Sequence, residues 1–439
     1  MTTKIAGSET LQAAGTTTEN RIFYGWWIVA GSFLNLFFAV GIIFYGFPVF
    51  YPALVESLGF TRAQVTQGFL LGFVIAGLPF GLLAGSLIDR IGARRVILAG
   101  VGLIGVPLLL MGRMTQFWEY EILCVVEILG YVLAGPIANQ VLVARWFEAR
   151  RGRAMGYAYL GLGLGGMVSP LLVNFLIRSI GWRHAFESIG LVILGVLFPV
   201  GIWVTRSGPE EMGLRPDGLH LAEPQQPRSA ETVSQNTRVA AAARTRNFWL
   251  IIAGSTLAIG AIGAVIQHFI LFLKDLGYSA TTASRFSTLL LGSSLAGRVL
   301  VGYVADRFSK KNIMALFYFV LGASIFVLLG AQQPGAVGCF AVIFGFAMGA
   351  DYMLIPLVTA ECFGTASLGK LLGLIIMGYS LGQWGAPWIT GRIFEATRSY
   401  DLAWKIMAVA SMLGAAAIYA ISRMSPEMPQ TPQKSTSTS

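Results

Sequence analysis

The chain has 439 residues, of which 55% are hydrophobic and only 12% are charged, and its mean hydropathy is +0.68. Soluble domains carry about 25% charged residues, so this composition excludes an ordinary soluble enzyme. The net charge of +10 comes from short basic clusters between apolar runs, which is more typical of a membrane topology signal than of nucleic-acid binding.

Twelve apolar segments are long enough to cross a bilayer, and backbone groups in hydrocarbon must pair within helices. The predicted fold is therefore an all-α membrane protein with twelve transmembrane helices in two pseudo-symmetric six-helix lobes. The expected spans are 22–47, 62–86, 93–112, 118–143, 154–177, 182–204, 248–273, 285–305, 313–330, 335–360, 367–391 and 402–422. The expected domains are tail 1–21, N-terminal lobe 22–205, linker 206–246, C-terminal lobe 247–423 and tail 424–439.

Lysine and arginine placement predicts the orientation of these spans. With both termini inside, 21 of the 31 basic residues fall in inside segments and nine fall in outside segments, while Arg298 lies within a span. Basic residues accumulate on the cytoplasmic side of membrane proteins. We therefore expect both termini to be cytoplasmic, in a multi-pass protein of the cell inner membrane.

A motif after the second span is repeated after the eighth. Each copy has a glycine, an aspartate four residues later and then a basic cluster, and the two aspartates are 217 residues apart. The repeat is typical of a transporter with two parallel halves, and we interpret it as a conformational gating motif. Its residues are Gly85, Asp89, Arg90, Gly92, Arg94, Arg95, Gly302, Asp306 and Arg307.

Asp89 lies near the C-terminal end of its own helix, where the helix dipole disfavours an anion. Its charge is expected to be offset by nearby arginines or by the N-terminus of another helix. The start of the eleventh span, near Gly369 and Lys370, is a candidate for that second role.

Several spans carry polar residues. Glu127 is costly in lipid, so it is expected to face the cavity or a partner, and it is a candidate for contact with a substrate or a proton. Histidine titrates near neutrality, so His268 is a further candidate for proton coupling, although a structural histidine at a helix end is twice as common. Asn139 follows Pro136 in the fourth span. Five polar residues are candidates for hydrogen bonding to a small anion: Asn35, Asn139, Tyr352, Tyr379 and Gln383. Each of them also suits a helix–helix contact.

Arg298 lies inside the apolar run 286–305. A charge at that depth costs roughly 2.5–3.5 kcal/mol on insertion scales, so it usually meets an anion or an acidic side chain in a polar cavity. Asp351 in the tenth span lies at a similar depth. We consider that Asp351 pairs with Arg298 in the empty site and that protonation or substrate exchange breaks the pair, although helix–helix hydrogen bonding explains it equally well.

Further segments support a family resemblance. Together with the repeated motif, the run from Arg145 to Gly156, Gly181-Trp182-Arg183, Pro209 to Gly218 and Phe23 to Trp27 resemble the major facilitator superfamily, in its monocarboxylate porter and oxalate/formate antiporter-like branch. This resemblance covers essentially the whole chain.

The resemblance implies a role for Arg298, because an arginine in the eighth helix of that branch binds the substrate carboxylate. A guanidinium can bind a carboxylate through two parallel hydrogen bonds. The eukaryotic members have an aspartate four residues earlier, whereas this chain has Ser294. Their proton-coupling scheme therefore does not transfer directly.

We therefore expect secondary active transport of a small organic anion, a monocarboxylate or dicarboxylate, by proton symport or anion exchange. Efflux of a drug-like compound and a non-transporting membrane sensor are the alternatives. The chain has no nucleotide-binding loop and no catalytic triad spacing, so neither an enzyme nor a cofactor is expected. Binding of nucleic acid is not expected either. We expect the protein to be a monomer in the lipid bilayer. The three cysteines, which show no metal or disulfide spacing and are expected to be buried, are Cys124, Cys339 and Cys362.

Overall fold

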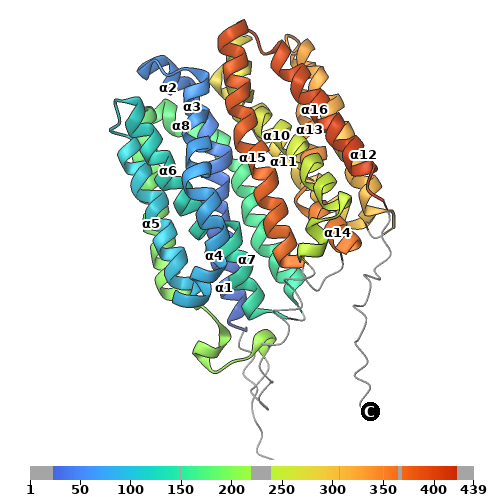
Figure 1. Ribbon diagram of the computed structural model, residues 1–439. Coiled ribbons are helices and arrows are strands. Elements are labelled where there is room, and N and C mark those ends of the chain that lie inside the picture. The colour runs from blue at the N-terminus through green and yellow to red at the C-terminus, as the bar shows by residue number, and fades with distance from the viewer. Residues whose placement is uncertain are drawn as a thin grey trace, which may run out of the picture.

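A computed structural model describes residues 23–148, 150–218, 239–305, 307–349, 351–363 and 368–422. Within these ranges the regular structure is helical, and no strand occurs. The helices form two lobes that stand side by side, the first coloured blue to green and the second yellow to red (Figure 1).

The N-terminal lobe contains the first six spans. The first span includes ten residues of wider π-helical turns, and the fifth and sixth spans run into each other at Gly181, whose φ of +80° breaks the helix. Its elements are α1 (Gly25–Leu36), η1 (Phe37–Gly46), η2 (Phe47–Val49), α2 (Tyr51–Leu58), α3 (Arg62–Gly72), η3 (Phe73–Gly77), α4 (Leu78–Ile91), α5 (Ala93–Met111), α6 (Phe117–Ala134), α7 (Pro136–Trp146), α8 (Arg151–Pro199) and η4 (Val200–Val204).

The C-terminal lobe contains the other six spans. The two short turns between the lobes are η5 (Pro209–Met212) and η6 (Pro216–Gly218). The elements of the second lobe are α10 (Arg246–Asp275), α11 (Ala280–Ala305), α12 (Lys310–Ile325), η8 (Phe326–Gly330), α13 (Pro334–Gly349), α14 (Asp351–Phe363), α15 (Leu368–Thr397) and α16 (Asp401–Tyr419).

The predicted twelve-helix, two-lobe fold is confirmed. Nine stretches of the described residues qualify as membrane spans by length and hydropathy alone, with the fifth and sixth counted together as Gly152–Val204. The helices α11 and α15 are not among the nine. Both pack against the opposite lobe, and a helix covered by protein in this way does not need an apolar surface all round.

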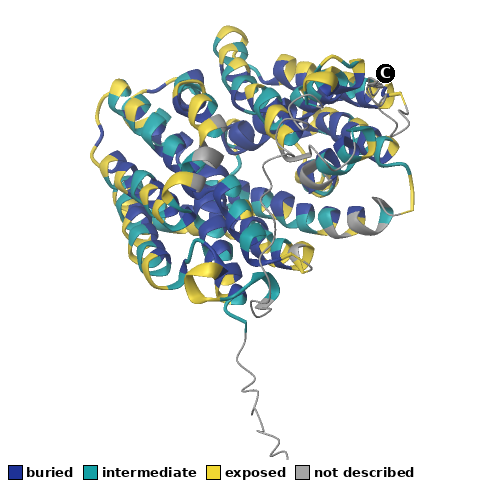
Figure 2. Ribbon diagram, turned by 60° about the horizontal axis from the view of Figure 1, so that its bottom comes forward, coloured by how far each residue is buried: buried dark blue, intermediate teal, exposed yellow. Residues whose placement is uncertain are grey.

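The outer faces of the bundle expose large apolar side chains, and Figure 2 shows exposed residues around the periphery of the bundle. Trp203 is 72% exposed and Phe175 is 64% exposed. Such faces suit contact with lipid. Cys124 is buried but Cys339 is exposed, so the expectation of burial was wrong for Cys339, because a thiol on an apolar span can also face lipid.

Two ends of the bundle are distinguished below. The linker end is the one where α1 begins, α16 ends and the linker joins the lobes (bottom of Figure 1). The far end is the opposite one. It holds the connections between α2 and α3, between α10 and α11 and between α15 and α16.

Candidate functional site

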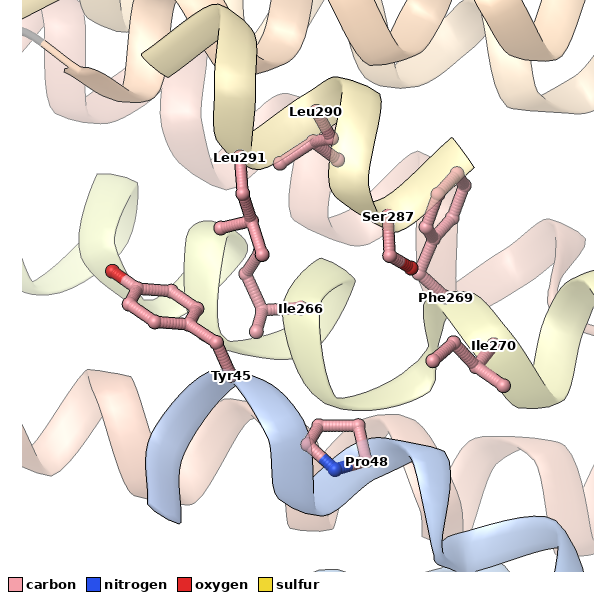
Figure 3. Close-up of a pocket in the computed structure, with 8 residues that line it drawn as sticks. All are labelled: Tyr45, Pro48, Ile266, Phe269, Ile270, Ser287, Leu290 and Leu291. Carbon is pink, nitrogen blue, oxygen red and sulfur yellow. The ribbon is translucent and has the colours of Figure 1, made fainter. Parts of the chain in front are cut away.

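A small cavity lies where the two lobes meet in the far half of the bundle (Figure 3). The N-terminal lobe contributes Tyr45 and Pro48 from the first span, and they face side chains of α10 and α11. Apart from the hydroxyl groups of Tyr45 and Ser287, the lining is apolar. The lining residues on the second lobe are Ile266, Phe269, Ile270, Ser287, Leu290 and Leu291.

Arg298 lies on α11, seven residues from Leu291 towards the linker end, which is about 10 Å along the helix axis. It is half-buried and lies against α8 of the opposite lobe. A Cβ atom on Gly163 would be 3.3 Å from its Nη1 atom and 2.2 Å from Cδ2 of Leu295. The guanidinium group therefore lies at the junction of the lobes, in a space that exists because residue 163 has no side chain.

The residue that takes the place of the eukaryotic aspartate is not free for a ligand. Ser294 is buried, and its hydroxyl group donates to the carbonyl oxygen of Leu291 at 2.7 Å. Asp351 and Tyr352 begin α14, and their side chains lie outside the described part of the structure. The pairing of Asp351 with Arg298 therefore stays a prediction.

Asn139 contacts its own helix. Its Nδ2 atom donates to the carbonyl oxygens of Ala134, at 2.7 Å, and Gly135, at 2.9 Å. The fourth span is broken at Gly135, between α6 and α7, with φ −83° and ψ −147°, so this amide binds carbonyl groups at the break. The Oδ1 atom of Asn139 is buried and, among the described residues, has no hydrogen-bond partner.

The other residues predicted to bind substrate lie on two helices. Asn35 is buried in α1, and its Oδ1 atom has no hydrogen-bond partner in the described part of the chain. On α15, Tyr379 is buried and Gln383 is half-buried. The contacts of these residues with a substrate stay a prediction.

His268 is completely buried and both of its ring nitrogens are engaged. Nε2 lies 2.8 Å from the carbonyl oxygen of Pro387, and Nδ1 lies 3.0 Å from the hydroxyl group of Tyr400. A carbonyl can only accept, so Nε2 carries a proton and donates. In this arrangement the histidine ties α10 to α15 and to the loop before α16.

Glu127 is completely buried in α6. Within the described structure, neither of its carboxylate oxygens has a hydrogen-bond partner. It lies within electrostatic reach of Tyr51 on α2 and of Cys124 one turn earlier. This environment differs from that of Glu121 on the same helix, whose carboxylate accepts a hydrogen bond from Gln67 at 2.9 Å.

At the far end, charged side chains join the lobes. Arg62, the first residue of α3, forms an ion pair with Asp275 at the end of α10 and donates to the Tyr400 hydroxyl group at 2.9 Å. Its guanidinium carbon also lies 3.9 Å from the ring centre of Phe394. We refer to Arg62, Asp275, Phe394 and Tyr400 as the far-end lock.

Two further contacts reinforce the far-end lock. Lys274 forms an ion pair with Glu56, and Glu395 accepts a hydrogen bond from the backbone N–H of Ala63 at 2.9 Å. Hydrogen bonds from Tyr51 to Gln267, and from Asn174 and Arg178 to Thr281, also join the lobes in the far half of the bundle. In this conformation the lobes are therefore closed at the far end.

The sequence prediction missed the far-end lock, because it treats Arg62 only as the first residue of the second expected span and assigns no role to Asp275. A usable signal was present, since opposite charges occupy the same end of the second and seventh spans. The sequence does not say which loop charges meet across the lobes.

The gating motif lies at the linker end. Arg94 donates from its backbone N–H to the Ser207 hydroxyl group at 3.3 Å and from its side chain to the Ile202 carbonyl. Gly92 has φ +87°, and a Cβ atom there would be 2.8 Å from Oγ of Ser207, so both conformation and space favour glycine. Three basic residues of the motif are exposed, namely Arg90, Arg95 and Arg307.

The predicted partner of Asp89 cannot be placed. Asp306 and the side chain of Asp89 lie outside the described part of the structure. The surroundings of Gly85, Gly302 and Gly369 lie outside it as well. Lys370 is exposed at the start of α15. The pairing of Asp89 with that helix start stays a prediction.

Comparisons with known proteins agree with this architecture. The profile of the Major Facilitator Superfamily matches residues 33–387. The chain is 27% identical to the MFS transporter asaE of Aspergillus flavus, over 78% of this chain and 74% of that protein. It is 25% identical to monocarboxylate transporter 12 of Rattus norvegicus, over 87% of this chain and 82% of that protein.

A solved structure also shares the fold. This structure is a bacterial homolog of the human lysosomal transporter Spinster in an inward-facing and occupied conformation. It matches with a TM-score of 0.66 at 16% identity, over 92% of this chain and 98% of that one.

Proposed function

Since the chain belongs to the Major Facilitator Superfamily, we propose that it is a secondary active transporter of a small organic anion, a monocarboxylate or dicarboxylate. Its two lobes alternate the access of a central site between the two sides of the membrane. Proton symport or exchange of anions supplies the energy. One relative is a monocarboxylate transporter by name, which supports this choice of substrate class.

The observation that carries the proposal is the position of Arg298. A guanidinium group at the junction of the lobes, half-buried and beside Gly163 of the opposite lobe, suits recognition of a carboxylate through two parallel hydrogen bonds. Because α11 belongs to one lobe and α8 to the other, an anion held by Arg298 contacts the surface that moves. The polar groups of Asn35, Tyr379 and Gln383 are proposed to complete the site.

The excess of basic residues at the linker end supports a cytoplasmic location of that end. In that orientation the far-end lock closes the outside, which is the closure expected of an inward-facing state. A substrate then leaves towards the cytoplasm after the lock has formed.

The test is uptake of radiolabelled lactate, pyruvate and oxalate into proteoliposomes. We expect Arg298→Ala to lower uptake about 100-fold, because a hydrogen bond to a charged group contributes about 1.5–3 kcal/mol and 1.4 kcal/mol is tenfold. Arg298→Lys, which keeps the charge but not the paired geometry, should lose about tenfold. Arg285→Ala is the matched control, since Arg285 is exposed on the same helix.

Three results would contradict the proposal. If the Arg298→Ala variant took up the acids as fast as the wild type, Arg298 would not be the carboxylate anchor. Equal uptake of lactate and its uncharged amide would favour transport or efflux of a neutral, drug-like compound. Absence of any transport, with a folded protein, would favour a membrane sensor.

A further inference from the structure

Glu127 lies at mid-depth in the N-terminal lobe. It is ten residues after Phe117, the far-end start of α6, so it is about 15 Å along the helix. The side chain has no exposed surface, and neither carboxylate oxygen is hydrogen-bonded to any described residue. A buried polar group of this kind needs an explanation, because buried polar groups are normally paired.

The surroundings of Glu127 contain weak acids but no described cation. The hydroxyl group of Tyr120 donates to the carbonyl oxygen of Val65 at 2.5 Å, and Glu121 is bound by Gln67. The titratable groups nearest to Glu127 are Tyr51, Tyr120 and Cys124. The described charged side chains on the helices around α6 lie at helix ends and are Arg62, Arg90, Arg94, Arg95 and Arg145.

The charge state of Glu127 follows from these surroundings. An ionised carboxylate without a partner is far more costly to bury than a neutral carboxyl group. The far-end-closed conformation therefore holds a neutral Glu127, with a proton on one of its two oxygens.

Tyr51, which lies within electrostatic reach of Glu127, contacts the other lobe. The hydroxyl group of Tyr51 donates to Oε1 of Gln267 on α10 at 2.7 Å. On α15, Trp384 stacks on Phe69 of α3, with the ring centres 5.7 Å apart, and meets Phe44 edge-on at 5.4 Å. Opening of the far end must break these contacts, and water from the passage then reaches this part of the N-terminal lobe.

We propose that Glu127 is the proton-binding site of this transporter and that the far end closes only after Glu127 has taken up a proton. The carboxylate takes the proton from a hydronium ion in the open passage: one O–H bond of hydronium breaks, one O–H bond forms on Glu127, and a water molecule is left. The proposal rests on the proposed transport function and makes it proton symport. Tyr51 is then a positioning residue, because it links this site to Gln267 of the moving lobe.

The first experiment measures the proton itself. Infrared difference spectra of the full-length protein in lipid vesicles are recorded between mildly acidic and alkaline buffers. We expect Glu127→Gln to lose one protonated-carboxyl band that the wild type shows, and Glu121→Gln to retain it. An unchanged band in Glu127→Gln would overturn the proposal, and neither result depends on a substrate.

The second experiment measures closure. Spin labels on Ser57→Cys and Gln332→Cys, both exposed at the far end of opposite lobes, report the inter-lobe distance after Cys339 and Cys362 are replaced by serine. Cys124 is buried and stays. We expect the wild type and Glu121→Gln to open at alkaline pH and Glu127→Gln to stay closed. Glu127→Asp keeps a titratable group and should respond to pH again.

The outcomes separate this proposal from the transport function. A wild type that does not respond to pH, or a Glu127→Gln variant that opens as the wild type does, overturns the proton site but leaves carboxylate exchange possible. A variant that exchanges lactate across the membrane but no longer accumulates it against a gradient supports the site. If Arg298→Ala loses lactate exchange, that result tests only the role of Arg298 as the substrate anchor and not the proton site.

Discussion

The two lobes can be compared through the 217-residue offset of the repeated motif. The same offset relates Gly165 of α8 to Gly382 of α15. A Cβ atom on Gly165 would lie 2.3 Å from the carbonyl oxygen of Phe37, and one on Gly382 would lie 2.2 Å from that of Thr256. The fifth span therefore touches the first, through α8 and η1, and the eleventh span touches the seventh, through α15 and α10. Equivalent glycines make the two contacts.

The chemistry of the lobes is not repeated. The position equivalent to Arg298 in the N-terminal lobe is Gly81, and the position equivalent to Glu127 in the C-terminal lobe is Phe344, a completely buried aromatic residue. One lobe therefore carries the buried carboxyl group of Glu127, and the other carries the half-buried guanidinium group of Arg298.

This difference shows which parts of a duplicated fold are constrained. Contacts at van der Waals distance between helix backbones allow almost no change, since interiors are close-packed. A side chain that faces the passage meets space or water, so each copy can acquire its own charge. Charges on different lobes change their separation when the lobes move, which suits coupling of a proton to an anion.

The largest expected effect comes from breaking the shared packing. Gly165→Ala and Gly382→Ala should each destabilise the protein by about 3 kcal/mol, because the added methyl group meets a carbonyl oxygen and the backbones must separate. The measurement is the unfolding temperature in detergent. Similar losses in both lobes would support equivalent roles.

Matched controls are available on the same helices. A Cβ atom on Gly195 of α8 or Gly385 of α15 meets nothing within 4 Å. Alanine there should be neutral or stabilising, because glycine is a poor helix former. If Gly165→Ala or Gly382→Ala also left the unfolding temperature unchanged, the close approach of the helices would not be a shared constraint.

The sequence predicted the fold well, because the spans depend on apolar length and the repeat on local motifs. It predicted Arg298 as a residue within a span but not its neighbour Gly163, since contact between the lobes depends on their relative position. In the structure, Asn139 contacts the break in the fourth span, between α6 and α7. The pattern of polar residues in the sequence does not indicate this contact. For Glu127, the sequence indicated a costly residue without showing that its oxygens are unpaired.

A smaller effect should follow from loosening the contact between the lobes. Arg62→Ala removes the ion pair with Asp275, the hydrogen bond to Tyr400 and the cation–π contacts with Phe394 and Tyr400. We expect the far-end-open population to rise about fivefold, or about 1 kcal/mol, because these contacts are partly exposed to water. The spin-label distance between residues 57 and 332 measures this shift.

Arg113→Ala is the control for the lock, because Arg113 forms an ion pair at the far end with Glu187 of its own lobe, 3.5 Å away. It should leave the inter-lobe distance unchanged. Equal behaviour of the two variants would mean that the lock does not bias the equilibrium between open and closed lobes.

The smallest effect concerns the linker, whose folded part packs on the N-terminal lobe only, among described contacts. The Asp217 carboxylate accepts hydrogen bonds from the backbone N–H groups of Glu148, at 2.9 Å, and Arg150, at 3.3 Å. Asp217→Ala should cost below about 1 kcal/mol, since these groups are exposed to water, and should speed cleavage by a glutamate-specific protease after the exposed Glu211.

Asp217→Asn gives a graded comparison. Asp217 has φ +60°, a conformation that asparagine tolerates better than alanine, and the amide keeps one acceptor oxygen for the 148–150 loop. We therefore expect a cleavage rate between those of the wild type and Asp217→Ala. If alanine and asparagine variants were cleaved at the wild-type rate, the linker would be held to the N-terminal lobe by its other contacts, from Trp146 to Arg206 and from Arg94 to Ser207.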